Sequence, residues 1–313
     1  MRVVITGGAG LQGSKLATKL IQMGHDVTVA DNFQRGSHRV KDAQIVGIDL
    51  RYSHLEELLR HTDYLFHLAA HVGGVEYIQK KDQEVMLDNL RVDSNVIAGA
   101  QAAKVRNFIF ASTACVYPVR YQQNWDSILS EEMAFNPVEP ESGYGWAKLT
   151  AEYQLNKVQD MKVAILRLFN VYGPGEDFLP GSHVVPELIR KTLAPGDTLT
   201  VYGSGEAGRC FTYVDDAVDA YIAMMNMGMG KGPINIGSPD PIRIKDLADL
   251  IMKIAGSKKL KKFDLSKPVG MIGRTPNLER AKSILGWEAK VPLNAGLELT
   301  IDWMKKETKE SGR

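Results

Sequence analysis

The sequence predicts an α/β fold, a Rossmann-type doubly wound parallel sheet with a smaller C-terminal substrate-binding lobe. Short β-rich runs alternate with amphipathic helical stretches over roughly the first half of the chain, and this alternation is typical of a parallel sheet covered by helices on both faces. The first run ends in a series of glycines. The length of 313 residues suits a main domain with a smaller companion.

The first strand, Arg2–Thr6, is followed by glycines at positions 7, 10 and 13 and by a helix predicted over Leu11–Met23. Such glycines let the chain turn tightly, approach a phosphate closely and pack the helix against the sheet. The helix N-terminus then offers oriented N–H groups to an anion. A glycine triplet alone is weak evidence, but here it lies between a strand and a helix, as a dinucleotide site requires.

The second strand, Asp26–Ala30, ends beside Asp31, about 20 residues after the glycines. A carboxylate at this spacing can accept hydrogen bonds from ribose hydroxyls and repel a 2′-phosphate. Asp31 therefore favours NAD over NADP, although the nearby Arg35 and Arg39 leave the second cofactor open.

The remaining elements continue the alternation and then loosen after about residue 170. We predict strands at Gln44–Ile48, Tyr64–Leu68, Asn107–Ser112 and Lys162–Leu168, and helices at Leu55–His61, Glu84–Ala103, Ser142–Lys157, Val214–Met225, Ile244–Ile254, Asn277–Leu285 and Ala295–Lys305. Residues 118–143 show neither helical nor strand periodicity in their apolar residues. We expect them to form either a segment that covers the substrate or a surface loop. We place the NAD-binding domain at residues 1–169 with about 211–237, and the substrate lobe at about 170–210 and 238–313.

The composition argues against several classes of partner. The net charge is +1, from 38 Lys and Arg against 37 Asp and Glu, so neither nucleic acid nor an anionic membrane is expected. Two cysteines suit a reducing compartment. With no signal-peptide pattern and no apolar run of about 20 residues, we expect a cytoplasmic protein. No metal site is predicted.

Tyr144 and Lys148 stand four residues apart on a predicted helix, so they share one face. A phenol has a pKa of about 10, and a neighbouring ammonium together with a cationic nicotinamide ring would lower it. Tyr144 can then take the proton of an alcohol while a hydride leaves the carbon. Thr113, at the end of the fifth strand, can hydrogen-bond to the same oxygen.

Five motifs together resemble the extended short-chain dehydrogenase/reductase family, whose members act mostly on nucleotide sugars. They are Gly7–Gly13, His67–Ala70, Thr113, the Tyr144/Lys148 pair and Asn170–Pro174, and the resemblance runs to about residue 304. It implies tightly bound NAD and a homodimer. The predicted cofactor contacts are Gly7, Gly10, Leu11, Gln12, Gly13, Asp31, Asn32, Arg35, Asp49, Leu50, Leu68, Ala69, Ala70, Tyr144 and Lys148.

The segment after Thr113 distinguishes branches of that family. The resemblance implies an acidic residue here in sugar 4,6-dehydratases and glucuronate decarboxylases, and residues 114–118 hold none. Cys115, with the glycines at 73 and 74, resembles GDP-mannose 3,5-epimerases and GDP-fucose synthases. Those enzymes need an acid/base group on each side of the sugar ring, and the matching positions are Cys115 and His183. A thiol pKa near 8.5 and an imidazole pKa near 6.5 bracket neutrality.

The resemblance also implies contacts to the sugar nucleotide. Bidentate guanidinium groups suit a diphosphate, and two arginines occupy phosphate-binding positions. The predicted substrate contacts are Gly73, Gly74, Asn170, Lys191, Arg209 and Arg274.

The sequence thus predicts an NAD-dependent epimerase of the GDP-mannose 3,5-epimerase type, with a GDP-sugar as the favoured substrate. Three alternatives stay open. A UDP-glucose/galactose-type 4-epimerase needs only Thr113, Tyr144 and Lys148; a 4-keto-sugar epimerase/reductase would consume free reduced cofactor; and a sensor would bind NAD without turnover.

Overall fold

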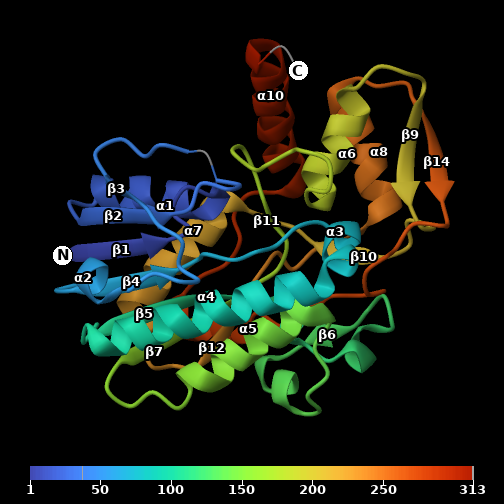
Figure 1. Ribbon diagram of the computed structural model, residues 1–313. Helices are drawn as coiled ribbons and strands as arrows, with labels where there is room; N and C mark the ends of the chain where they lie inside the picture. The colour runs from blue at the N-terminus through green and yellow to red at the C-terminus, as the bar shows by residue number, and fades with distance from the viewer. Residues whose placement is uncertain (37, 312–313) are drawn as a thin grey trace.

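The computed structural model describes residues 1–36 and 38–311 and contains a seven-stranded parallel sheet (Figure 1). This confirms the predicted fold class. β1 and β4 lie side by side at the centre of the sheet. The chain leaves β1 toward β2 on one side and leaves β4 toward β5 on the other, and a ligand crevice is expected at the carboxyl ends of strands where the order reverses in this way. In spatial order the strands are β12 (Pro233–Ile236), β7 (Lys162–Leu168), β5 (Asn107–Thr113), β4 (Tyr64–His67), β1 (Arg2–Thr6), β2 (Asp26–Asp31) and β3 (Gln44–Gly47).

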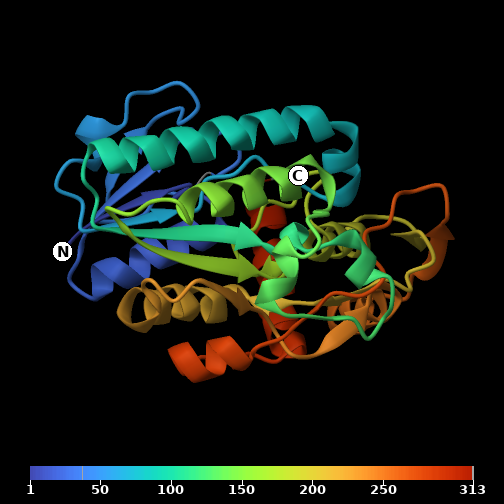
Figure 2. The ribbon, with the colours of Figure 1, turned by 90° about the horizontal axis from the view of Figure 1, so that it is seen from below.

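Helices cover both faces of the sheet, as Figure 2 shows. On one face α1 (Leu11–Gln22) and α7 (Val214–Ala223) bury apolar side chains against the strands, and on the other face α4 (Asp82–Ala102) and α5 (Ser142–Leu155) do the same. In α1 the fully buried side chains are Leu16, Ala17 and Leu20. This spacing aligns them on one stripe of the helix, which explains why it packs on the sheet.

The smaller lobe lies beyond the carboxyl ends of the strands, where β1 and β5 point (Figures 1 and 2). Its core is built from three helices and β9 (Thr198–Tyr202), which pairs in parallel with the more exposed β14 (Leu260–Asp264). The helices are α6 (Val184–Leu193), α8 (Ile244–Ala255) and α10 (Leu293–Ser311). Gly256 ends α8 in the left-handed conformation, with φ at 71°, which glycine adopts without strain.

Residues 118–143 form no long element, in agreement with their lack of periodicity. They contain two 3₁₀ segments, η2 (Val119–Gln122) and η3 (Glu131–Phe135), and the short strand β6 (Ile128–Leu129). β6 pairs in parallel with β15 (Thr275–Pro276), and the main-chain oxygen of Gln122 accepts from the N–H of Ile272 at 3.0 Å. The stretch therefore packs against the lobe segment that carries Arg274.

Each predicted strand and helix is present, with differences at its ends, whereas α6, β9 and β14 were not predicted. The helix expected over Leu55–His61 is a single turn, and the last helix is longer than expected. The remaining elements are α2 (Glu56–Leu59), α3 (Val75–Lys80), η1 (Ala114–Val116), β8 (Val171–Tyr172), β10 (Gly208–Cys210), β11 (Thr212–Tyr213), η4 (Met224–Gly228), β13 (Pro241–Arg243) and α9 (Glu279–Leu285). Among the described residues, no helix is both long and apolar enough to span a membrane.

Candidate active site

One large cavity of about 1680 Å³ opens between the carboxyl ends of the sheet strands and the lobe. Every residue predicted to act in catalysis, cofactor binding or substrate binding lines it, except Lys148. Lys148 lies deeper, with 1% of its side chain exposed. The structure thus brings residues from position 7 to position 274 into one site.

The glycine turn has the shape that a pyrophosphate needs. A Cβ atom on Gly7, whose φ is +70°, would lie 2.6 Å from the main-chain nitrogen of Ala69. A Cβ atom on Gly13 would lie 2.3 Å from the carbonyl oxygen of Gly7. Because no side chain fits at either position, the backbone leaves a cradle at the N-terminus of α1, and the residues present fit a dinucleotide.

Asp31 closes β2 beside this cradle and is almost fully buried. Its Oδ2 accepts a hydrogen bond from the N–H of Ala9 at 3.0 Å, and its Oδ1 accepts from the N–H of Phe33 at 2.8 Å. Each carboxylate oxygen can accept a second hydrogen bond. Asp31 therefore holds the glycine turn in shape and retains acceptor capacity for a ribose hydroxyl.

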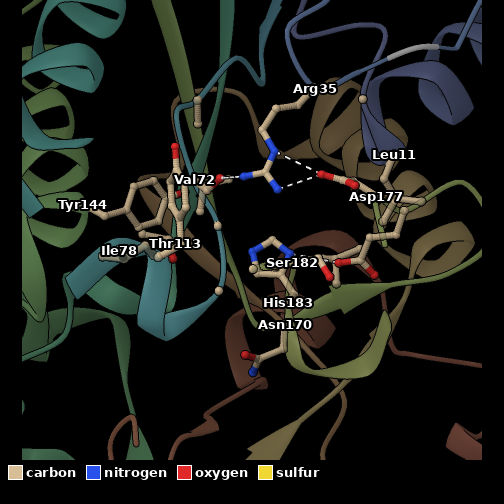
Figure 3. Close-up of a pocket in the computed structure, with 18 of the residues that line it drawn as sticks. Leu11, Arg35, Val72, Ile78, Thr113, Tyr144, Asn170, Asp177, Ser182 and His183 are labelled. Atoms are coloured by element: carbon tan, nitrogen blue, oxygen red, sulfur yellow. Dashed lines mark hydrogen bonds and ion pairs between the residues drawn. The ribbon is translucent and has the colours of Figure 1, made fainter. Parts of the chain in front are cut away.

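Two predicted cofactor residues have protein partners instead of open side chains. Arg35 crosses the pocket and donates to Asp177 at 2.7 Å and to the carbonyl oxygen of Val72 (Figure 3). Asp49 forms an ion pair with Arg51 at 2.7 Å, which holds the pKa of that carboxyl below its usual value. Their contacts to a cofactor stay predictions.

Tyr144 projects from α5 toward the end of β5, where Thr113 lies (Figure 3). Burial raises the pKa of Tyr144 well above that of a free phenol, and a hydrogen bond to Thr113 opposes this only in part. We expected the ammonium of Lys148 to lower this pKa. That expectation concerns the enzyme with its cofactor bound and stays a prediction; Lys148 itself is paired with Asp93.

Lys148 belongs to a buried chain of polar groups that the sequence did not reveal. Its Nζ lies 3.2 Å from Asp93 Oδ1, and the same oxygen lies 3.0 Å from His67 Nε2. His67 Nδ1 lies 2.6 Å from the hydroxyl of Thr6. Burial lowers the pKa of His67, which favours its neutral form. A carboxylate at 93 among the apolar residues of α4 was the available signal.

Cys115 is the middle residue of the 3₁₀ turn that follows β5, and its N–H donates to Thr113 Oγ1 at 3.2 Å. Burial raises the pKa of the thiol, and the positive charge of Arg274 opposes that rise. Arg274 Nη1 lies 3.5 Å from the sulfur. Cys115 is consequently a protonated thiol at neutral pH, an acid with a guanidinium beside it.

The two predicted phosphate-binding arginines differ in their surroundings. Arg274 donates from Nε to Gln122 Oε1 at 2.6 Å and from Nη2 to Glu141 Oε2. Arg209 donates to the carbonyl oxygens of Gly208 and Met271, both at 2.6 Å. Burial and the neighbouring Arg274 lower the pKa of Arg209 to about 10. Glu141 lies in the cavity wall, so an acid is present near Cys115 although none follows Thr113 in sequence.

His183 is the N-cap of α6 and faces the same cavity, with half of its side chain exposed (Figure 3). Its Nδ1 lies 2.9 Å from Glu176 Oε1. Burial raises the pKa of Glu176, and His183 opposes that rise. This carboxylate fixes the direction of the imidazole, as a second group commonly does for an acid/base histidine.

Gly74 places the loop that carries His183. Its N–H donates to the carbonyl oxygen of Gly181 at 2.8 Å, and a Cβ atom on Gly74 would lie 2.3 Å from the carbonyl oxygen of Ser182. A Cβ on Gly73 would lie 2.7 Å from the ring of Tyr77. Both glycines thus permit close approach of the two sides of the pocket.

Two further predicted substrate residues contact the lobe itself. Asn170 has a φ of +42°, and its Nδ2 donates to the carbonyl oxygen of Cys210 at 2.9 Å. Lys191 Nζ lies 3.3 Å from Glu187 Oε1 and 4.1 Å from the centre of the Tyr202 ring. Their roles toward a substrate stay predictions.

Comparison with known proteins identifies the class of enzyme. Residues 3–237 match the NAD dependent epimerase/dehydratase family. The chain belongs to this family. It is 29% identical to GDP-mannose 3,5-epimerase of Arabidopsis thaliana, over 98% of this chain and 83% of the relative. It is 34% identical to UDP-glucuronic acid decarboxylase 1 of Xenopus tropicalis, over 98% of this chain and 72% of the relative.

Solved structures agree with this assignment. The crystal structure of UDP-glucose 4-epimerase with UDP-glucose from Thermotoga maritima superposes with a TM-score of 0.88 at 28% identity, covering 98% of this chain and 99% of the other. The family is NAD-dependent, which confirms the predicted cofactor. This member of the epimerase/dehydratase family is therefore an NAD-dependent enzyme that modifies nucleotide sugars. Its relatives divide between epimerases and decarboxylases.

Several acidic residues in or behind the cavity were not predicted from the sequence, among them Glu141, Glu176, Asp177 and Asp93. Glu141 immediately precedes the Ser-Gly-Tyr segment, and the pair Glu176 and Asp177 follows the Gly-Pro-Gly turn after β8. A carboxylate close to a motif residue was the signal in those cases.

Proposed function

We propose that this enzyme is a nucleotide-sugar epimerase of the GDP-mannose 3,5-epimerase type. The observation that carries the proposal is the pair of acid/base groups in one cavity. Cys115 lies beside Thr113 on the sheet side, and His183 approaches from the lobe side with Glu176 behind it. Proton exchange at a carbon needs one group to take a proton and another to give one.

The residues divide the work as follows. Tyr144 takes the proton of the C4 hydroxyl, and Thr113 hydrogen-bonds to that oxygen. When bound at the glycine turn and Asp31, NAD would supply hydride-transfer chemistry and the positive charge of its oxidised ring. The C4 ketone makes the hydrogens on C3 and C5 acidic, because an enolate spreads its charge onto the carbonyl oxygen.

After inversion at both carbons, each acid/base group has regained its original protonation state. His183 takes a proton from one carbon while the thiol of Cys115 gives a proton to the opposite face of that carbon. A thiolate next to Arg274 and an imidazolium next to Glu176 remain, and each charge has an opposite partner. The reverse exchange at the second carbon restores the thiol and the neutral imidazole.

Solvent deuterium tests this proposal directly. The NAD-loaded enzyme is incubated with GDP-mannose in D₂O, and the recovered sugar nucleotide is examined by NMR. We expect deuterium at C3 and C5, and loss of that label in Cys115→Ser and His183→Gln. Recovery of unlabelled GDP-mannose after long incubation would refute the proposal.

A 4-epimerase is the second candidate, and the likeness to the UDP-glucose 4-epimerase structure favours it. It requires Tyr144, Thr113 and Lys148 but no proton exchange at carbon. Conversion of UDP-glucose to UDP-galactose in D₂O without label on the ring carbons would support this candidate instead.

The other candidate functions predict different products or behaviour. A 4-keto-sugar reductase would consume free reduced cofactor, and a decarboxylase would release CO₂ from UDP-glucuronate. An NAD sensor would tolerate Tyr144→Phe without loss of function. The homodimer predicted from the sequence is part of the proposal, and sedimentation of the NAD-loaded protein tests it.

A further inference from the structure

Glu141 carries a charge at the reacting end of the cavity that the proposed proton exchange does not use. It precedes α5 directly, its N–H donates to the carbonyl oxygen of Cys115 at 3.0 Å, and its own carbonyl oxygen accepts from the N–H of Gly145 at 3.1 Å. These bonds fix its main chain between Cys115 and the helix of Tyr144. The side chain lines the cavity and is 19% exposed.

The carboxylate of Glu141 is ionised. Burial alone would raise its pKa, but the charges of Arg274 and Arg209 and the hydrogen bonds from Arg274 and Cys115 hold that pKa below its usual value. A fixed negative charge therefore lies in contact with both the thiol and a guanidinium.

Arg274 already has one carboxylate partner, Glu141, which balances its charge. Arg274 is 5% exposed, and its fork reaches Gln122 from Nε, Glu141 from Nη2 and the Cys115 sulfur from Nη1. Arg209 differs, since its Nη1 donates to two main-chain carbonyl oxygens. The charge of Arg274 is thus balanced within the protein, while that of Arg209 is available to a diphosphate.

A sugar whose C4 hydroxyl lies on Tyr144 and Thr113 also meets Cys115, and with it Glu141. A neutral hydroxyl or hydroxymethyl group there can donate a hydrogen bond to the carboxylate. A second carboxylate would instead face the like charge of Glu141, and Glu141 already balances the charge of Arg274.

We propose that Glu141 is a specificity-determining residue that restricts the site to nucleotide sugars with an uncharged sugar and excludes uronic acids. The inference rests on the proposed function for the placement of the sugar. It predicts a ligand preference opposite to that of a decarboxylase, whose substrate carries a carboxylate on the sugar.

Binding measurements on paired ligands test it. Calorimetry on the NAD-loaded enzyme compares UDP-glucose with UDP-glucuronate and GDP-mannose with GDP-mannuronate, so that the nucleotide cancels within each pair. We expect the wild type to prefer the neutral sugar by about ten- to a hundredfold, as a like-charge contact at short range predicts. Glu141→Gln keeps the shape and removes the charge, and the preference should fall to within about threefold.

Glu139→Gln is the matched control. Glu139 lies two residues earlier, is 40% exposed and pairs with Arg120 at 2.7 Å outside the cavity. We expect its ligand preference to equal that of the wild type, since the same charge is removed from the same segment at a place remote from the sugar.

The possible results of these binding measurements distinguish failure of the Glu141 inference from failure of the proposed function. Equal affinity of the wild type for both members of a pair, or an unchanged preference in Glu141→Gln, would overturn this inference and leave the proposed function standing. Failure of all four sugar nucleotides to bind would overturn both. If Glu141→Gln does not fold, the wild-type ratio together with Glu141→Ala decides the matter.

Discussion

The two sides of the pocket are built differently. On the sheet side, Lys148, Asp93 and His67 form a buried chain with side-chain exposures of at most 2%. On the lobe side, His183 is half exposed and lies on the loop before α6. The Arg35–Asp177 ion pair that crosses the pocket is also partly exposed, at 38% and 24%.

This difference indicates that the side chains on the sheet side are held in one position, while those on the lobe side can move. Groups at strand ends and inside packed helices have one geometry, because moving them would break the core. Groups on loops with water-exposed partners can shift when a ligand enters. We infer that the hydride step depends on the preformed sheet side, while proton exchange needs both sides, with Cys115 on the sheet side and His183 on the lobe side.

Removing the phenol should have the largest effect. We expect Tyr144→Phe to lower turnover by about 10²–10⁴-fold, the range for loss of a positioned acid/base group. Bound NAD, measured by absorbance after denaturation, should remain, because the phenyl ring still fills the same space. Wild-type turnover in this variant would show that the sheet side does not carry the hydride step.

Breaking the buried chain should cost stability. Asp93→Asn leaves the charge of Lys148 buried without its ion-pair partner, so we expect a loss of about 3–5 kcal/mol in the free energy of unfolding. Denaturant titration measures it. The control, Asp219→Asn, breaks the exposed pair with Lys19 at 3.4 Å and should cost under about 1 kcal/mol. Similar losses in the free energy of unfolding in both variants would contradict the view that the buried pair contributes more to stability than the exposed pair.

On the lobe side, His183→Gln should separate the two steps. We expect solvent deuterium incorporation to fall by about 10²–10⁴-fold, because one of the two proton carriers is lost. Transient reduction of the bound cofactor, followed at 340 nm, should continue, since Tyr144 and Thr113 are unchanged. Loss of both signals would mean that the two sides are not independent.

The thiol of Cys115, on the sheet side, should lose its proton only at a pH above the usual thiol pKa. Burial raises the pKa of Cys115, and a raised pKa means a smaller thiolate fraction at any given pH. Alkylation by iodoacetamide, compared with Cys115→Ser to subtract Cys210, should therefore reach half its maximum rate above the usual thiol pKa of about 8.5. A midpoint near neutrality would indicate a thiolate base instead of a protonated acid.

The smallest effect is expected at the bridge across the pocket. Arg35→Gln removes a partly exposed ion pair with Asp177, so we expect the Kd for NAD to rise by no more than about fivefold. Fluorescence titration measures it, and high salt should reduce the difference. A change of a hundredfold would place Arg35 in direct contact with the cofactor.

The sequence determined the features that depend on local chain geometry. The glycine turn, the six principal predicted strands and the helical spacing of Tyr144 and Lys148 all appear in the structure within a residue or two. Turns that exclude a Cβ and helical faces that repeat every few residues follow from neighbouring residues alone. These features suffice to predict the sheet and the glycine turn at one end of the pocket.

Only the tertiary structure decided which charges meet. Lys148 pairs with Asp93 across 55 positions, and Arg274 pairs with Glu141 across 133. Both pairs bear on the chemistry, because the first places a carboxylate beside the ammonium expected to lower the pKa of Tyr144 and the second puts an acid beside Cys115. Burial then sets the direction of each pKa. Neither the partners nor the burial follows from spacing in the chain, since both arise when distant elements pack together.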